Sequence, residues 1–86
     1  MRYTVDFTPA AAREFLKLPR NTQTVLSSAI TALADNPRPP GVKKLTNAAQ
    51  RTYRIREGDY RIVYDIEDEV LRVLVVCVSH RREVDR

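Results

Sequence analysis

The chain has 86 residues, a formal net charge of +4 and a hydrophobic content of 43%. This length accommodates one domain, residues 1–86, and the ordinary apolar content excludes a chain that is disordered throughout. Only three of its fifteen basic residues are lysines and the other twelve are arginines. Because the planar guanidinium matches phosphate, this balance favours an anionic partner such as nucleic acid or an acidic protein segment, with a merely solvated basic surface as the alternative.

Cysteine and histidine each occur once, as Cys77 and His80. These single residues exclude an internal disulfide and the usual zinc spacings, so we expect no metal. Residues 2–7 lack the pattern of a signal peptide, and the longest apolar run, residues 73–78, is too short to span a bilayer. A reduced cytoplasmic location without a membrane partner is therefore expected.

The first elements in the chain are predicted to be a strand and a helix. Residues 2–7 alternate polar and apolar side chains, as a short amphipathic strand does. Thr8 and Pro9 are typical of a helix N-cap and of the first helical position. They precede a predicted helix over residues 10–18.

Pro19 introduces a second predicted helix, whose apolar residues form a stripe at helical spacing. The helix is expected to end at residues 35–36, because a residue before a proline resists helical geometry and Pro37 follows. The short link between the two helices predicts an antiparallel helical hairpin.

The second half of the chain is predicted to form most of a sheet. Residues 37–41 read as a stiff connector, residues 42–45 as a short extended piece and residues 46–50 as a loop. Three strands follow, over residues 51–56, 60–66 and 70–79. Their connections have hairpin length, and Gly58 can supply the positive φ that such turns need. The predicted class is α+β, with the helices on one face of a small twisted sheet and the other face open.

Arginine alternates with apolar and aromatic residues along residues 53–64. Side chains two apart on a strand share a face, so Arg54 and Arg56 lie together, and Arg61 lies on the corresponding face of the next strand if the register allows. This pattern predicts a cationic open surface that suits a phosphate polymer. A solvated outer sheet face, where arginines are common, is the alternative.

The tail, residues 79–86, follows the last strand directly and adds further charge. His80 and Arg81 are expected to reach the same sheet face as the strand arginines. His80 has the only side chain with an unperturbed pKa near neutrality, which makes it the simplest candidate for proton transfer. An exposed residue at a strand end and a frayed basic terminus are the alternatives.

These residues resemble the RelE/ParE superfamily of toxins from type II toxin–antitoxin modules. The resemblance rests on residues 53–64 (Tyr-Arg-Ile-Arg-Glu-Gly-Asp-Tyr-Arg-Ile-Val-Tyr), the acidic turn at residues 67–69 and the final His-Arg-Arg-Glu-Val. Residues 3–11 and the Lys-Lys-Leu element at residues 43–45 agree with it. It covers essentially the whole chain and looks closer to the RelE branch than to the ParE branch.

The resemblance implies a compact domain with a helical hairpin packed on a twisted, mainly antiparallel sheet. It also implies an endoribonuclease that cuts mRNA in the ribosomal A site without a metal or other cofactor. The ribose 2′-hydroxyl attacks the adjacent phosphorus, giving a 2′,3′-cyclic phosphate and a 5′-hydroxyl. That reaction requires a base, positive charge at the phosphoryl oxygens and an acid for the leaving oxygen.

The resemblance also assigns roles to single residues. Arg54 and Arg56 fall on basic active-site positions that the RelE branch often fills with lysine. Arg61 falls on the arginine expected to hold the scissile phosphate, and Arg81 on the one expected to stabilise the transition state or help the leaving group. Arginine stays protonated, so it is a good clamp and a poor base. Further contacts to RNA are expected from Lys43, Lys44 and Arg82.

Asp85 departs from the family pattern, because many relatives carry a tyrosine there. A tyrosine would stack on a base, whereas an aspartate cannot stack and places negative charge beside phosphate. With a reference pKa near 4, an aspartate is also a weak base. The base is therefore His80 or Asp85, or the protein cuts RNA poorly.

Two other functions remain open. One is a ParE-type toxin that poisons DNA gyrase, and the other is a weakly active or inactive toxin that acts mainly by binding an antitoxin. The resemblance implies a RelB-like antitoxin, the ribosomal A site and mRNA as partners. Operator DNA is expected to be bound only indirectly, through the antitoxin.

Overall fold

A computed structural model describes residues 2–45 and 51–80. These residues form two α-helices, a five-stranded sheet and one short 3-10 helix. In chain order the elements are β1 (Thr4–Phe7), α1 (Pro9–Leu16), α2 (Arg20–Asp35), β2 (Lys43–Lys44), β3 (Thr52–Glu57), β4 (Tyr60–Glu67), η1 (Asp68–Val70) and β5 (Arg72–His80). The predicted α+β class and element order are confirmed, while the loop predicted over residues 46–50 lies outside the described residues.

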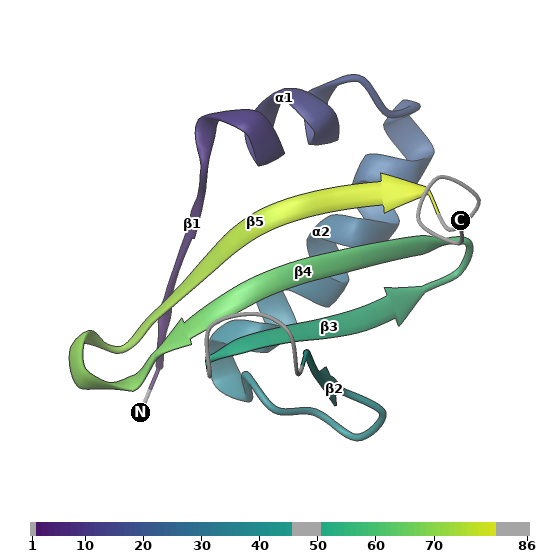
Figure 1. Cartoon of the computed structure of the whole chain (residues 1–86). Coiled ribbons are helices and arrows are strands. Elements are labelled where there is room, and N and C mark those ends of the chain that lie inside the picture. Colours follow the sequence, from purple (N-terminus) through teal and green to yellow (C-terminus); the bar gives the residue numbers. More distant parts are fainter. Residues whose placement is uncertain (1, 46–50, 81–86) are drawn as a thin grey trace.

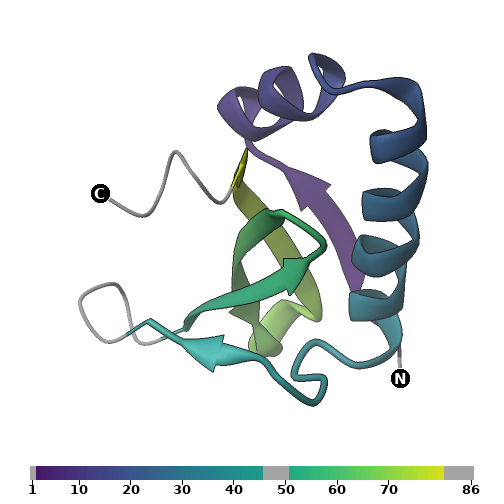
Figure 2. The ribbon, with the colours of Figure 1, turned by 90° about the vertical axis from the view of Figure 1, so that its right-hand side faces the viewer.

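Local sequence explains where the helices begin and end. The Thr8 hydroxyl accepts a hydrogen bond from the Ala11 backbone N–H at 3.2 Å, which caps α1 as predicted. The Gln23 side chain donates to the carbonyls of Leu16 and Leu18, at 3.3 and 3.0 Å, and so ties the end of α1 to α2. The two helices are consecutive as predicted, but the expectation that they run antiparallel is wrong, because α2 leaves α1 at a steep angle (Figure 2).

The sheet has the strand order β1-β5-β4-β3-β2, and its two outer strands precede the three inner strands in the chain. β1 pairs with β5 in parallel, whereas β2, β3, β4 and β5 pair antiparallel (Figure 1). The end of β3, the start of β4 and the end of β5 meet at one end of the sheet. This end carries Arg56 and Arg61.

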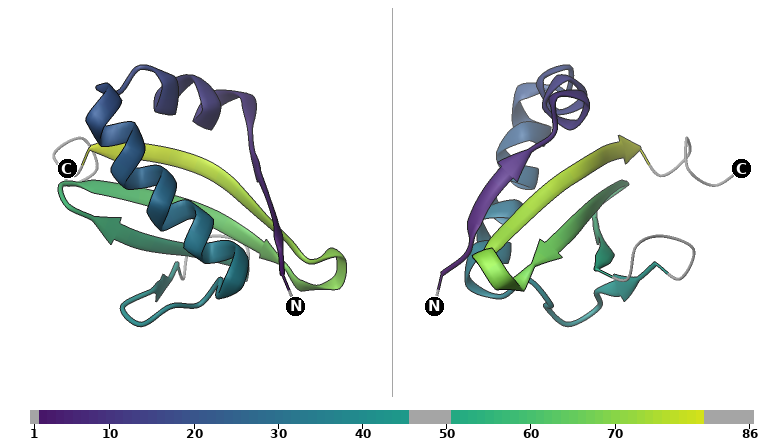
Figure 3. Two further views of the ribbon diagram at one scale, coloured as in Figure 1. Left: turned by 180° about the vertical axis from the view of Figure 1, so that it is seen from behind. Right: turned by 60° about the vertical axis from the view of Figure 1, so that its left-hand side comes forward.

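Both helices cover the same face of the sheet, and α2 crosses it diagonally (Figures 2 and 3). The hydrophobic core lies between these two layers. Its most deeply buried large side chains are Leu26, Leu33, Ile62, Tyr64, Ile66, Val73 and Val75. Each such burial contributes roughly 1.5–3 kcal/mol, so the core holds the sheet and fixes which face remains available for function.

The ladder between β4 and β5 contains a β-bulge. Val63 pairs with Cys77 and Tyr64 pairs with Val75, so the ladder skips Val76. The skipped residue reverses the alternation along β5: Val75 is buried before the bulge, and Val78 is buried after it. This reversal decides the orientation of the last residues of β5.

Neither described helix combines the length and the apolar character that a membrane-crossing helix requires.

Candidate nucleic-acid interface

The register of β3 and β4 brings the three strand arginines together. Arg54 lies opposite Val63, and Arg56 lies opposite Arg61. Directly paired residues project from the same face of a sheet, and Ile55 and Ile62 occupy the other face, toward the core. The prediction that Arg54, Arg56 and Arg61 share a face is therefore confirmed.

The three arginines differ in exposure. Arg56 is exposed and Arg54 is half-buried, but Arg61 is only 6% exposed. The prediction of an open cationic surface is therefore wrong for Arg61. Burial restricts its side-chain rotamers and reduces the screening of its charge by water, which strengthens its interaction with an anion.

β2 extends the cationic face by one lysine. Lys43 pairs with Arg54 and so projects from the same face, whereas Lys44 pairs with Tyr53 and projects from the opposite one. Both lysines are exposed. The structure brings Lys43, but not Lys44, to the arginines. A hollow beside β2 is lined by Pro40, Gly41, Lys43, Arg54, Ile55 and Arg56.

β5 brings Ser79, which the sequence reasoning missed, and turns His80 away. Ser79 lies opposite Arg61 and shares its face, while His80 lies opposite Tyr60. The rings of His80 and Tyr60 meet edge to face, with centroids 5.1 Å apart, and Tyr60 packs against the core. The prediction that His80 reaches the face of Arg61 is therefore wrong. The physical cause is the bulge at Val76, which reverses the alternation of faces along β5.

Lys43, Arg54, Arg56, Arg61 and Ser79 thus form what we call the basic face. Within the described ranges, no hydrogen bond or ion pair joins the side chains of Lys43 or Arg56 to another residue. Their charged ends are available to an anion. The predicted site residues Arg81, Arg82 and Asp85 lie outside the described residues.

The acidic residues of the same sheet face lie at its other end and have partners. Asp65 accepts a hydrogen bond from Thr52 at 2.6 Å. The Arg72 guanidinium donates to Glu67 at 2.8 and 3.1 Å and lowers the pKa of that carboxyl. The unbalanced positive charge of this face is therefore concentrated on the basic face.

The chemistry available to the described part of the site is electrostatic. Arg54, Arg56, Arg61 and Lys43 present only hydrogen-bond donors and positive charge, which can hold and polarise a phosphate. In residues 2–45 and 51–80, no group of three His, Cys, Asp or Glu side chains is arranged to hold a metal ion.

Comparisons with known proteins agree with this fold. The model of a family described as the ParE toxin of type II toxin–antitoxin systems matches residues 5–85. Toxin RelG of Mycobacterium tuberculosis is 38% identical over 87 residues, which cover 100% of this chain and 99% of that protein. The mRNA interferase toxin RelE of Escherichia coli is 28% identical over 81 residues, which cover 94% of this chain and 85% of that protein. A chain of the toxin–antitoxin complex RelBE2 from Mycobacterium tuberculosis matches with a TM-score of 0.83 and 33% identity. The match covers 94% of this chain and 93% of that chain.

Proposed function

Because this chain belongs to the ParE toxin family within the RelE/ParE superfamily of type II toxins, we propose that it is a RelE-type mRNA endoribonuclease. It cuts mRNA in the ribosomal A site and thereby inhibits translation. The observation that carries the proposal is the basic face, where Arg54, Arg56 and Arg61 converge from two paired strands. The Escherichia coli relative is named an mRNA interferase toxin, which supports the same substrate.

In the proposed reaction, the 2′-hydroxyl oxygen attacks the adjacent phosphorus while the bond from phosphorus to the 5′ oxygen breaks. A base removes the proton of the 2′-hydroxyl, and an acid protonates the leaving 5′ oxygen. The products are a 2′,3′-cyclic phosphate and a 5′-hydroxyl, and the reaction needs no metal or other cofactor. Arg61 holds the scissile phosphate, Arg54 and Arg56 neutralise its oxygens, and Arg81 stabilises the transition state.

The base comes from the tail in this proposal. His80 contacts Tyr60 on the opposite sheet face, which disfavours it as the base. Asp85 is then the candidate. Because an aspartate is a weak base, cleavage by this protein is expected to be slow compared with that by relatives that carry a tyrosine there.

The test adds purified protein to programmed ribosomes and maps the ends of the mRNA. We expect new A-site ends with wild type and an approximately hundredfold slower reaction with Arg61→Ala or Arg81→Ala, since each removes one transition-state donor. Arg13→Ala is the matched control, because Arg13 is an exposed arginine of α1 and lies outside the site. Thermal unfolding verifies that each variant is folded. Absence of new mRNA ends with folded wild type would refute the nuclease.

A ParE-like inhibitor of DNA gyrase is the second candidate, favoured by the description of the matching family. It predicts relaxed plasmid or cleaved gyrase–DNA complexes in cells whose mRNA stays intact. Plasmid topology and mRNA ends from the same cultures separate the two activities.

The proposed partner is a RelB-like antitoxin, in line with the solved RelBE2 complex of the Mycobacterium tuberculosis relative. We place the protein in the cytoplasm, where ribosomes are available, and operator DNA is contacted only through the antitoxin. If the protein acts mainly by binding antitoxin, its expression without antitoxin is harmless. Growth arrest that the antitoxin reverses would exclude that alternative.

A further inference from the structure

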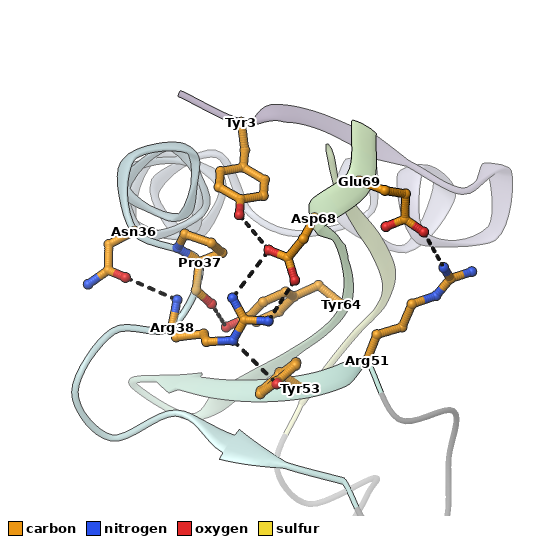
Figure 4. A network of polar contacts seen from close by, with 9 residues as sticks. All are labelled: Tyr3, Asn36, Pro37, Arg38, Arg51, Tyr53, Tyr64, Asp68 and Glu69. Carbon is orange, nitrogen blue, oxygen red and sulfur yellow. Dashed lines mark hydrogen bonds and ion pairs between the residues drawn. The ribbon is translucent and has the colours of Figure 1, made fainter. Parts of the chain in front are cut away.

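Arg38 is the centre of a polar network (Figure 4). The network lies where β3 begins and β4 ends, at the end of the sheet opposite the one that carries Arg61. Arg38 lies in the connector between α2 and β2. Its guanidinium donates to the two carboxylate oxygens of Asp68 at 3.4 and 3.0 Å, and to the Tyr53 hydroxyl at 3.3 Å. The Tyr3 hydroxyl donates to the same carboxylate at 2.5 Å. Residues from four separate segments therefore meet at one ion pair.

Two aromatic residues reinforce this attachment from beneath. Tyr64 is fully buried, and its hydroxyl donates to the Pro37 carbonyl at 2.7 Å. Tyr53 stacks on Tyr64 with ring centroids 6.3 Å apart, and the Arg38 guanidinium lies 5.2 Å from the centroid of the Tyr53 ring. Pro37 and Arg38 are thus held against the sheet by side chains of β3, β4 and η1. We call this set of contacts the Arg38 clasp.

The connector then leads directly to the basic face. It turns at Gly41, which has a φ of 86°, and the Val42 N–H donates to the Pro39 carbonyl at 3.1 Å. Lys43 follows, opposite Arg54. Only two residues form β2, and the bond from the Leu45 N–H to the Thr52 carbonyl at 3.0 Å continues its pairing with β3. So short an edge strand is weak alone, and its position depends on how the connector is held.

We propose that Arg38 is a positioning residue, which holds Lys43 beside Arg54 through the connector and so strengthens RNA binding without contacting RNA. The role in RNA binding rests on the proposed function, whereas the effect on β2 does not. The ion pair is intact at neutral pH, because the Arg38 guanidinium holds the pKa of Asp68 below its ordinary value.

Hydrogen exchange of the Leu45 amide tests the effect on β2 without RNA. Arg38→Gln and Asp68→Asn each remove one partner of the ion pair, and we expect each to accelerate exchange by about fivefold, in line with a partly exposed ion pair. Arg2→Gln is the matched control, because Arg2 pairs with Asp35 of α2 and, among the described residues, has no hydrogen bond or ion pair with the connector. Unchanged exchange at Leu45 in both Arg38 and Asp68 variants would overturn the proposal.

A double-mutant cycle tests the route through Lys43. Affinity for a single-stranded RNA oligonucleotide is measured for Arg38→Gln, Lys43→Gln and the double variant, with Arg2→Gln as the control for lost charge. We expect Arg38→Gln to weaken binding by a few-fold in wild type but to have no further effect when Lys43 is absent. Equal effects of Arg38→Gln in both backgrounds would contradict the route through Lys43.

Asp68→Asn provides the sharpest distinction from simple electrostatics. It raises the net charge by one, which alone would strengthen RNA binding. Loss of the clasp predicts weaker binding instead, so tighter binding by this variant would refute the positioning role. If wild type bound no RNA, the proposed function would fail, and the exchange experiment would still decide whether Arg38 holds β2.

Discussion

Glu67 is a carboxylate whose contribution to stability depends on its neighbours. Its side chain is 12% exposed and accepts two hydrogen bonds from Arg72. The Arg51 guanidinium lies 3.9 Å from the same carboxylate. The hydrogen bonds from Arg72 are the main cause that lowers the pKa of Glu67, against the opposing effect of burial. A group with a lowered folded pKa stabilises the fold above its unfolded pKa and loses this contribution as the pH falls through the folded value.

We therefore expect Glu67→Gln to be less stable than wild type at neutral pH, and the difference to shrink as the pH falls below about 4.3, the ordinary glutamate pKa. The midpoint of thermal unfolding, measured for both proteins from pH 7 downward, provides the comparison. Glu69→Gln is the control, because the Glu69 side chain is 70% exposed in its ion pair with Arg51. A difference between Glu67→Gln and wild type that stays constant with pH would contradict this account.

At the scale of elements, the bulge in β5 separates two patterns of burial. Val73 and Val75 point into the core before it, and Val78 does so after it, although Val78 is an odd number of positions, three, after Val75. Strict alternation would place Val78 on the outer face and Cys77 in the core. The bulge thus directs Ser79 to the basic face and His80 to Tyr60.

Val78→Ala is expected to reduce the free energy of unfolding by about 2 kcal/mol, because it removes two buried methyl groups and leaves a cavity. Cys77→Ala is expected to cost less than half as much, since Cys77 is only partly buried. Urea denaturation measures both values. If Cys77→Ala reduced the free energy of unfolding more than Val78→Ala does, the alternation of buried residues along β5 would not be reversed after the bulge.

At the scale of the whole molecule, the two sheet faces have different roles. One face packs against the helices and forms the core, and the opposite face carries the positive charge. Both described helices lie on the core side of the sheet, so neither covers the basic face (Figure 3). Lys43 belongs to this face, but its neighbour Lys44 does not. These adjacent, equally charged residues therefore distinguish a specific phosphate site from a general effect of net charge.

We expect the salt dependence of RNA binding to report this difference. The logarithm of affinity falls with the logarithm of salt concentration. If Lys43 neutralises one phosphate, Lys43→Gln makes this slope shallower by about 0.7. Lys44→Gln is expected to leave the slope nearly unchanged. Binding to single-stranded RNA over a series of salt concentrations measures both slopes, and equal slopes for the two variants would argue against the face assignment.

Most of the secondary structure could be predicted from local sequence patterns. Helical spacing, the Thr8-Pro9 cap and the turn at Gly58 suffice to place the helices and the three antiparallel strands, because these features depend on residues close in sequence. The alternation around Arg54, Arg56 and Arg61 predicts a shared face, since their two strands are joined by a tight turn that limits the register.

Only the tertiary structure decided the features that depend on contacts between distant residues. The parallel pairing of β1 with β5 and the Arg38 clasp join segments far apart in the chain, and the bulge at Val76 depends on how β5 pairs with β4. In the uniformly apolar run of residues 73–78, burial cannot be inferred from alternation. The sequence by itself therefore determined a cationic strand pair on an α+β fold, and tertiary packing decided that Arg61 is buried there and that His80 faces the other way.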